Sequence, residues 1–161
     1  MSGNSPKIEI PNLKGAKAAI ISARWHPEIC EELVAGAKRA LGEAAIVDIE
    51  THYVPGSFEL PFAAKLALEN GADFAVVLGV VLRGETPHFD YVCKGVTDGV
   101  MQVSLQLNKP IGFGVLTVDN IEQAIARSGI LGSKEDKGFD SAVAALELFR
   151  LKRQLGGRFA Q

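Results

Sequence analysis

Apolar residues in this chain form short continuous runs that alternate with stretches in which they recur every three or four positions. Four runs, rich in valine, isoleucine and alanine, have the length of strands: residues 17–23, 45–51, 75–82 and 111–118. Continuous runs of this kind are typical of strands that are covered on both faces. The stretches between them predict helices over residues 27–42, 57–70 and 87–107, a short helix after Asn120, and a last helix after Lys137.

Strands that alternate with helices predict an α/β fold. We expect a flavodoxin-like three-layer sandwich, in which a four-stranded parallel sheet carries helices on both faces. A length of 161 residues favours one domain over residues 1–161. Residues 1–15 contain several proline and glycine residues and predict a loose N-terminal arm. Within it, Ile8 and Ile10 alternate with polar residues, as in a short edge strand that pairs outside its own sheet.

The most informative stretch joins the third apolar run to the helix that follows. Residues 83–86 break the apolar pattern, Thr86 suits an N-cap, and Pro87 suits the first helical position. The free N–H groups of this helix end and the missing side chain of Gly84 would suit an anion such as phosphate. His88, in the first turn, adds a proton carrier beside it. A histidine that is merely exposed at a helix end is the alternative interpretation.

Ligands of parallel sheets bind beyond the carboxyl ends of the strands, where the chain has further candidates. Trp25 could stack on a planar heterocycle, although a lone tryptophan is more often part of a core. Glu59 could bond a cyclic urea or amide, or simply add charge to a helix start. Phe113 belongs to a core by its pattern, and Arg127 and Lys137 to the surface. We expect one crevice to gather Trp25 and His26, residues 56–59, residues 82–88, and Phe113 with its neighbours.

Composition excludes several classes of function. A net charge of −2 with 22% charged residues indicates no nucleic-acid surface. No apolar run is long enough to cross a bilayer, and we expect no targeting segment. Cys30 and Cys93 stand far apart, which favours a reducing, cytoplasmic location over disulfides or a metal site. The nucleotide-binding motifs that begin at Gly79 and Gly112 are incomplete, so neither predicts a nucleotide cofactor.

Four motifs together resemble a known family. The most specific is GVVLRGETPHFDYV at residues 79–92, supported by PGSFELP at 55–61, FGVLT at 113–117 and EDKG at 135–138. In this order they are similar to the 6,7-dimethyl-8-ribityllumazine synthases of riboflavin biosynthesis. The resemblance implies a transferase-type condensing enzyme that joins 5-amino-6-(D-ribitylamino)uracil to 3,4-dihydroxy-2-butanone 4-phosphate and releases phosphate and water. It implies neither a cofactor nor a metal.

The resemblance also implies a role for each matching position. His88 would transfer protons. Gly84, Glu85 and Thr86 would bind the phosphate together with Arg127. The residues implied to contact the ribitylaminouracil are Trp25, Ser57, Phe58, Glu59, Val80, Val81, Leu82, Phe113 and Lys137.

Family members form pentamers, and some assemble sixty-subunit capsids. The resemblance therefore implies a homo-oligomer with active sites between subunits, to which Phe113, Arg127 and Lys137 come from the neighbouring subunit. The N-terminal strand would pair with that subunit as well. The connection from Arg127 to Lys137 is longer than in capsid formers, which favours a free pentamer. Riboflavin synthase is a further partner that the resemblance suggests.

Two alternatives remain open. A non-catalytic flavin-binding, lumazine-binding or shell-forming relative would keep the fold and Trp25, but we would expect it to lose His88 or Arg127. An archaeal-type riboflavin synthase consumes the lumazine and releases no phosphate, so it would not need a phosphate-binding turn. This chain has both residues and the turn, which favours the lumazine synthase.

Overall fold

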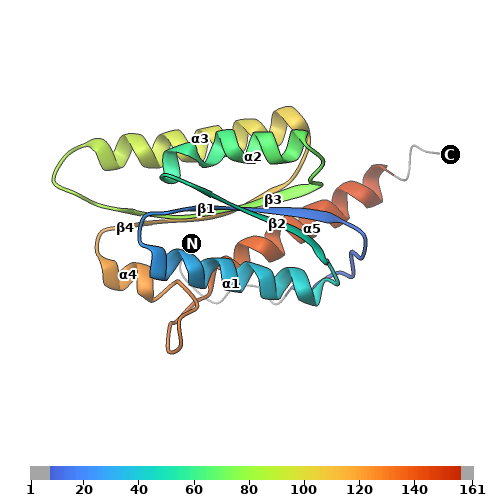
Figure 1. Cartoon of the computed structure of the whole chain (residues 1–161), viewed down its shortest axis with the longest axis horizontal. Coiled ribbons are helices and arrows are strands. Elements are labelled where there is room, and N and C mark those ends of the chain that lie inside the picture. Colours follow the sequence, from blue (N-terminus) through green and yellow to red (C-terminus); the bar gives the residue numbers. More distant parts are fainter. Residues whose placement is uncertain (1–7, 157–161) are drawn as a thin grey trace.

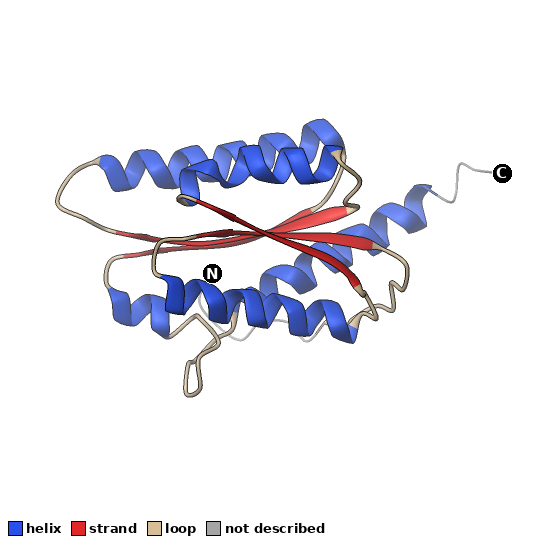
Figure 2. Ribbon diagram, viewed as in Figure 1, coloured by secondary structure: helices blue, strands red, loops and turns tan. Residues whose placement is uncertain are grey.

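The computed structural model describes residues 8–156 as a parallel sheet between two layers of helices. Helices α2 and α3 cover one face, and α1, α4 and α5 cover the other (Figure 1 and Figure 2). The strand order is β2-β1-β3-β4, and all neighbouring strands are parallel. The predicted three-layer α/β fold is therefore confirmed. The elements are β1 (Lys17–Ala23), α1 (Pro27–Glu43), β2 (Asp48–Val54), the 3-10 turn η1 (Ser57–Glu59), α2 (Leu60–Glu69), β3 (Phe74–Leu82), α3 (His88–Leu107), β4 (Ile111–Val118), α4 (Ile121–Ile125) and α5 (Lys137–Gly156).

The central strand β3 divides the hydrophobic core in two. Its residues 74–81 are all buried, and successive side chains point to opposite faces of the sheet. Phe74 and Val76 belong to the core beneath α1 and α5, whereas Ala75 and Val77 belong to the core beneath α2 and α3. The continuous apolar run is thus explained by burial on both faces. The edge strand β2 alternates between exposed and half-buried residues instead.

Several element boundaries differ from the sequence prediction. The second strand begins at Asp48 rather than at residue 45, because Ala45 takes the left-handed conformation with φ 60° as the chain leaves α1. The helix predicted over residues 57–70 is divided into η1 and α2. Pro87 is the N-cap of α3 rather than its first residue, although the Thr86 hydroxyl still accepts a weak bond from the His88 N–H at 3.4 Å.

The short helix α4 begins at the predicted residue. The Asn120 side chain accepts a hydrogen bond from the Gln123 N–H at 3.0 Å, as a capping residue should. The Gln123 side chain accepts from the N–H of Asp119 at 2.9 Å, one residue earlier than a capping box requires. This pair of bonds ties the end of β4 to α4.

The described part of the N-terminal arm forms no strand within residues 8–16. Leu13 is buried, and its N–H donates to the carbonyl of Ala44 at 2.8 Å, so this segment packs on its own subunit beside the end of α1. Residues 1–7 lie outside the described residues. Pairing of the arm with a neighbouring subunit stays a prediction. Among the helices of residues 8–156, none has the length and hydropathy to cross a membrane.

Candidate active site

The carboxyl ends of the strands form a stepped edge, at the left of Figure 1. The register of β1 with β3 ends at the pair Ser22 and Leu78. The register of β3 with β4 continues to Leu82 and Val118. Val80 and Val81, which are buried, and Leu82, which is half-buried, therefore pair with β4 alone. This end of β3 is where the sequence predicts contacts with the heterocycle.

Turn η1 fills the step between β1 and β3. A Cβ on Gly79 would lie 2.6 Å from Ser57 Oγ and 3.3 Å from the Cβ of Ala23, so only glycine allows this approach. Ser57 is 6% exposed, and its hydroxyl has no hydrogen-bond partner among the described residues. Because buried hydroxyl groups are nearly always bonded, Ser57 is a candidate to bond a substrate.

Trp25 projects from this edge and is not part of the core. Its side chain is 68% exposed, and the next residue, His26, takes a left-handed conformation before α1 begins. The indole lies beside Gly56, in the turn that follows β2. If Gly56 carried a Cβ, that atom would lie 3.6 Å from Cδ1 of the indole. The Cys30 thiol donates a hydrogen bond to the Trp25 carbonyl at 3.2 Å. The default expectation of a core tryptophan is wrong, and the exposed indole face suits stacking.

Phe58 and Glu59 lie on the same turn as Ser57. The Phe58 ring packs against Gly95 of α3, where a Cβ would lie only 2.6 Å from a ring carbon, yet 59% of this side chain is exposed. A Glu59 carboxylate oxygen accepts from the Gly56 N–H at 2.9 Å. This bond orients the carboxylate beside Trp25, which contacts the same glycine.

The turn from Arg83 to His88 is exposed throughout. Gly84 does not have a positive φ, and a Cβ there would meet no atom of residues 8–156 within 4 Å. The chain itself therefore gives no reason for a glycine at this position. Open backbone at a helix start suits an approaching anion. The geometry thus agrees with a phosphate site beside His88.

Phe113 lies neither in the core nor at this edge of its own chain, so these two expectations are wrong, while its contact with a substrate from a neighbouring subunit stays a prediction. It is the third residue of β4 and pairs with Val77, five residues before the strand ends at Val118. At a rise of about 3.3 Å per residue, it lies roughly 16 Å from the carboxyl edge. It is not core either, because 40% of the side chain is exposed.

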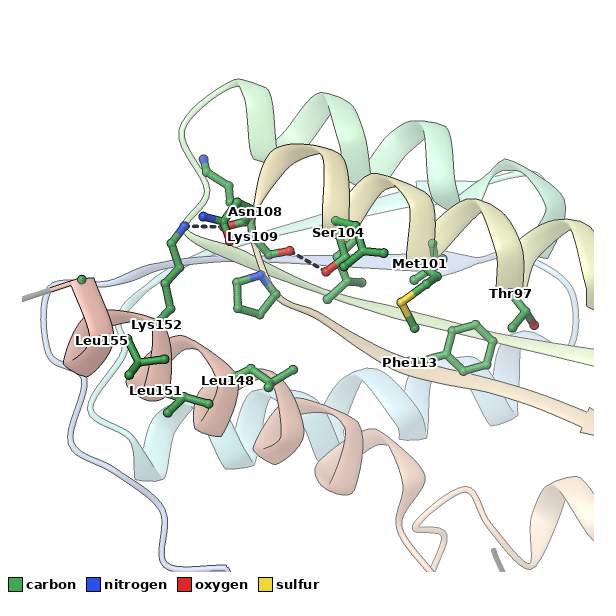
Figure 3. A pocket seen from close by; sticks show the side chains of 15 residues that line it. Thr97, Met101, Ser104, Asn108, Lys109, Phe113, Leu148, Leu151, Lys152 and Leu155 are labelled. Carbon is green, nitrogen blue, oxygen red and sulfur yellow. Dashed lines mark hydrogen bonds between the residues drawn. The ribbon is translucent and has the colours of Figure 1, made fainter.

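The Phe113 ring lies in an apolar groove between α3, β4 and α5 (Figure 3). The groove has a volume of about 870 Å³. Met101 and Leu105 of α3, which line it, are 60% and 73% exposed. The groove is therefore open to water and lined mainly by apolar side chains. From α5, the groove is lined by Leu148, Leu151, Lys152 and Leu155.

Arg127 and Lys137 lie together at the base of the loop between α4 and α5. The Lys137 N–H donates to the carbonyl of Arg127 at 2.9 Å. Arg127 Nη1 donates to the carbonyl of Gln123 at 2.9 Å. Lys137 Nζ lies 2.8 Å from Glu135 and 3.1 Å from Asp140, and the bond to Glu135 is the main cause of a raised Lys137 pKa.

These two cations lie on the other side of the sheet from α3, which carries His88 (Figure 1). Their side-chain partners in the described chain come from residues 123–140 rather than from the exposed turn. Arg127 also lines a polar hollow of about 360 Å³ with Lys134 and Glu135. The structure therefore brings Arg127 and Lys137 to each other, but not to the His88 of the same chain.

Sequence reasoning missed two contributors to the site. Gly79 has no side chain, and this allows Ser57 to approach β3 closely. The sequence did contain a signal for this approach, since a glycine interrupts a valine-rich strand. Asp119 bonds Arg83, 36 positions away in the sequence, and a pair so far apart leaves no local pattern. Within residues 8–156, no group of three or more His, Cys, Asp or Glu side chains is arranged to hold a metal ion.

Comparison with known proteins places these observations in one family. The sequence model of the family described as 6,7-dimethyl-8-ribityllumazine synthase matches residues 15–153. A relative of that name from Kineococcus radiotolerans is 51% identical over 148 residues, which cover 91% of each chain. One from Streptomyces coelicolor is 50% identical over 147 residues, again 91% of each chain. One from Clavibacter michiganensis is 48% identical over 160 residues, 98% of this chain and 99% of the relative.

Proposed function

Because the chain belongs to the 6,7-dimethyl-8-ribityllumazine synthase family, we propose that it condenses 5-amino-6-(D-ribitylamino)uracil with 3,4-dihydroxy-2-butanone 4-phosphate. The products are the lumazine, phosphate and water, and the reaction is the penultimate step of riboflavin biosynthesis. The observation that carries the proposal is the exposed turn in which open backbone at Gly84 adjoins His88. It combines an anion site with a proton carrier, and the reaction needs both.

The phosphate of the butanone is assigned to the backbone of Gly84, Glu85 and Thr86. The exposed backbone N–H groups of this turn and the positive dipole end of α3 favour an anion there. Phosphate leaves during the reaction as a dianion or monoanion, so the same groups stabilise the leaving group. A neighbouring Arg127 would add a planar, bidentate donor.

The ribitylaminouracil is assigned to the step between β1 and β3. Trp25 offers an exposed face for stacking on the pyrimidine. The Ser57 hydroxyl can donate a hydrogen bond, and the Glu59 carboxylate can accept one, from the ring amides and ribityl chain of this substrate. Phe58 and the strand end at Val80, Val81 and Leu82 would exclude water from the reacting atoms.

His88 is assigned to the proton transfers. The amine of the uracil attacks the ketone, water is lost as the imine forms, phosphate is eliminated, and ring closure releases a second water. Each of these steps moves a proton between nitrogen, carbon and oxygen atoms, which a positioned imidazole accelerates. Holding two substrates side by side supplies much of the remaining rate.

We propose in addition that the active site is completed by a second copy of the chain in a homopentamer. The arguments are the distance of Phe113 from the carboxyl edge, the location of Arg127 and Lys137 across the sheet from α3, and the open apolar groove. A neighbouring subunit that covers the groove would bring its own His88 to Phe113, Arg127 and Lys137 of this chain. On the length of the loop before Lys137, we favour a free pentamer over a capsid.

Two further proposals concern the cellular setting. The cysteines Cys30 and Cys93 are both free, which agrees with a reducing, cytoplasmic location. The lumazine is the substrate of riboflavin synthase, which makes that enzyme a candidate partner.

The experiment that tests the function mixes the purified protein with both substrates and follows lumazine fluorescence and phosphate release together. We expect both signals to rise well above the spontaneous reaction. His88→Ala should lower kcat by roughly 100-fold, the low end for a proton carrier, because part of the rate comes from positioning alone. His52→Ala is the matched control, since His52 is exposed on β2 and pairs only with Glu50 among the described residues.

Each outcome points to one function. Equal activity in His88→Ala and His52→Ala would remove the proton-transfer role. A folded, oligomeric wild-type protein that produces neither signal would favour a binding or shell-forming relative. Consumption of added lumazine with formation of riboflavin would identify a riboflavin synthase instead.

A further inference from the structure

Arg83 is the first residue after β3 and immediately precedes the exposed turn. Its backbone N–H donates to the carbonyl of Val118, the last residue of β4, at 2.9 Å. Its side-chain Nε donates to Asp119 Oδ1 at 2.7 Å. Two hydrogen bonds therefore fix Arg83 to the end of β4, at the start of the turn.

The same guanidinium also reaches the far end of the turn. Arg83 Nη1 lies 3.6 Å from Asp90 Oδ1, in the first turn of α3. Its Cζ lies 4.1 Å from the centre of the Phe89 ring, a favourable position for a cation over an aromatic face. Phe89 is buried, so the ring is a fixed platform. One side chain thus contacts both the strand before the turn and the helix after it.

The segment between these contacts has few described hydrogen bonds of its own. Residues 84–88 are all exposed, and a Cβ on Gly84 would touch nothing. Among the described hydrogen bonds, one joins two of these five residues. The His88 N–H donates to Thr86 Oγ1 at the long distance of 3.4 Å. The position of the turn therefore depends on how its two ends are held.

Arg83 also offsets an unfavourable charge. Asp90 is the acidic residue in the first turn of α3, where its carboxylate would repel a second anion such as phosphate. The guanidinium lies against Asp90 and Asp119 at once. Its charge is therefore already shared between two carboxylates, unlike that of an arginine held free to clamp a phosphate.

We propose that Arg83 is a positioning residue that clamps both ends of the turn from Gly84 to His88. The clamp keeps the turn backbone and His88 in the geometry that the condensation requires. The inference rests on the function proposed for this turn. Because an exposed ion pair contributes little to folding stability, the clamp should affect turnover rather than the stability of the fold.

The test removes the two sides of the same contact. We expect Arg83→Gln and Asp119→Asn each to lower kcat by about tenfold or more, since small displacements of reacting groups are costly. The KM for the ribitylaminouracil and the melting temperature should stay near their wild-type values. The double variant should be no worse than Arg83→Gln alone, because that change already removes the contact with Asp119. Arg83→Lys should recover part of kcat.

Arg150→Gln is the matched control. Arg150 is an exposed arginine of α5 that pairs with Glu147. Loss of this ion pair should leave kcat and both KM values unchanged. A loss of activity in the control comparable to that in Arg83→Gln would show a general response to removing a surface arginine, and would overturn the proposal.

Asp119→Asn separates positioning from direct phosphate binding. If Arg83 bound the phosphate itself, release of its charge from Asp119 would lower the KM for the butanone phosphate, whereas a clamp predicts a lower kcat. Wild-type kcat in Arg83→Gln would contradict the clamp. So would a melting temperature that falls in parallel with kcat in both single variants, because the role would then be structural.

The wild-type protein in the same assays distinguishes failure of this inference from failure of the proposed function. If the wild type produces no lumazine, the proposed function fails, and the clamp is judged by calorimetric titration with inorganic phosphate. Weaker phosphate binding in both Arg83→Gln and Asp119→Asn than in the wild type would support a clamp on the turn. Unchanged binding in both variants would exclude it.

Discussion

Gly84 lies in the exposed turn before α3, where a Cβ would meet no atom within 4 Å in the part of the chain that the structure describes. Gly84→Ala should therefore fold normally and gain about 0.4–1 kcal/mol from the reduced entropy of the unfolded chain. We expect the KM for the butanone phosphate to rise by about tenfold, since the added methyl group occupies the space through which a phosphate approaches the backbone. Urea unfolding and steady-state kinetics measure the two effects.

Gly42 provides the control for this change. A Cβ on Gly42 would likewise meet open space, and its φ is not positive, but it lies near the end of α1, far along the chain from the turn. Gly42→Ala should show the stability gain without the kinetic effect. An unchanged KM in Gly84→Ala would argue against direct contact between this backbone and the phosphate.

Cys30 carries the pH dependence that the structure predicts most clearly. Burial raises the pKa of its thiol from 9.0 to about 11. Between pH 9 and 11 the folded chain retains a proton that the unfolded chain loses, so the free energy of unfolding falls as the pH rises. The slope from this group is at most about 1.4 kcal/mol per pH unit, and its contribution is complete below pH 9.

Cys30→Ala removes this titration. Its free energy of unfolding should start lower at pH 8 because buried volume is lost. It should then decline less steeply than that of the wild type toward pH 11. Urea unfolding at matched protein concentrations across this range compares the slopes. Parallel slopes in the two proteins would mean that the thiol does not titrate differently in the folded chain.

At the scale of elements, α5 packs against α1 through glycine. A Cβ on Gly138, at the start of α5, would lie 2.7 Å from the Cα of Leu33 in α1, and closer still to its carbonyl group. Real Cβ atoms do not approach backbone so closely, so Gly138→Ala must push the helices apart. We expect a loss of roughly 1–3 kcal/mol in the free energy of unfolding, as for overpacked cores.

Gly156, at the other end of α5, serves as the comparison, since a Cβ on it would meet no atom of the described residues within 4 Å. Gly156→Ala should be neutral or slightly stabilising, because alanine favours the helix. Chemical unfolding of both variants at one protein concentration provides the measurement. Equal stabilities would show that the contact between α1 and α5 can relax without cost.

At the scale of the whole molecule, the proposed site between subunits predicts complementation. His88→Ala and Arg127→Ala chains should each be impaired alone. Co-expressed in equal amounts, they would form sites in which an intact His88 meets an intact Arg127 from the neighbour. Random assortment in a cyclic oligomer restores about a quarter of the sites. Lumazine formation by the mixed oligomer, compared with each variant alone, measures this fraction.

The control carries both substitutions in one chain and is co-expressed with the wild type. Random assortment again leaves about a quarter of the sites intact when the site lies between subunits, but about half when each site lies within one chain. Absence of complementation in a well-mixed oligomer would therefore indicate that both residues act within the same chain. Native mass spectrometry verifies the mixing and gives the number of subunits.

The pattern of apolar residues was enough to predict the class of fold and several of its elements. β4 has the predicted bounds Ile111–Val118, and Ala142 and Leu146 of α5 lie in the core as predicted. These features follow from the need to bury continuous strands and one stripe of each helix, which is a local property of the sequence. The polar turn before α3 was likewise predicted and is exposed, because its pattern lies within six consecutive residues, whereas the role of His88 stays a prediction.

Other features depended on contacts between distant segments, and only the tertiary structure decided them. The apolar neighbours of Phe113 favoured a core position, but as part of edge strand β4 its ring faces an open groove. Trp25 follows β1 and lies beside Gly56, from the turn after β2, with 68% of its side chain exposed. The contact of Ser57 with Gly79 and the bond from Arg83 to Asp119 arise from strand register. Register is set by the pairing of whole strands, so no local stretch of sequence contains it.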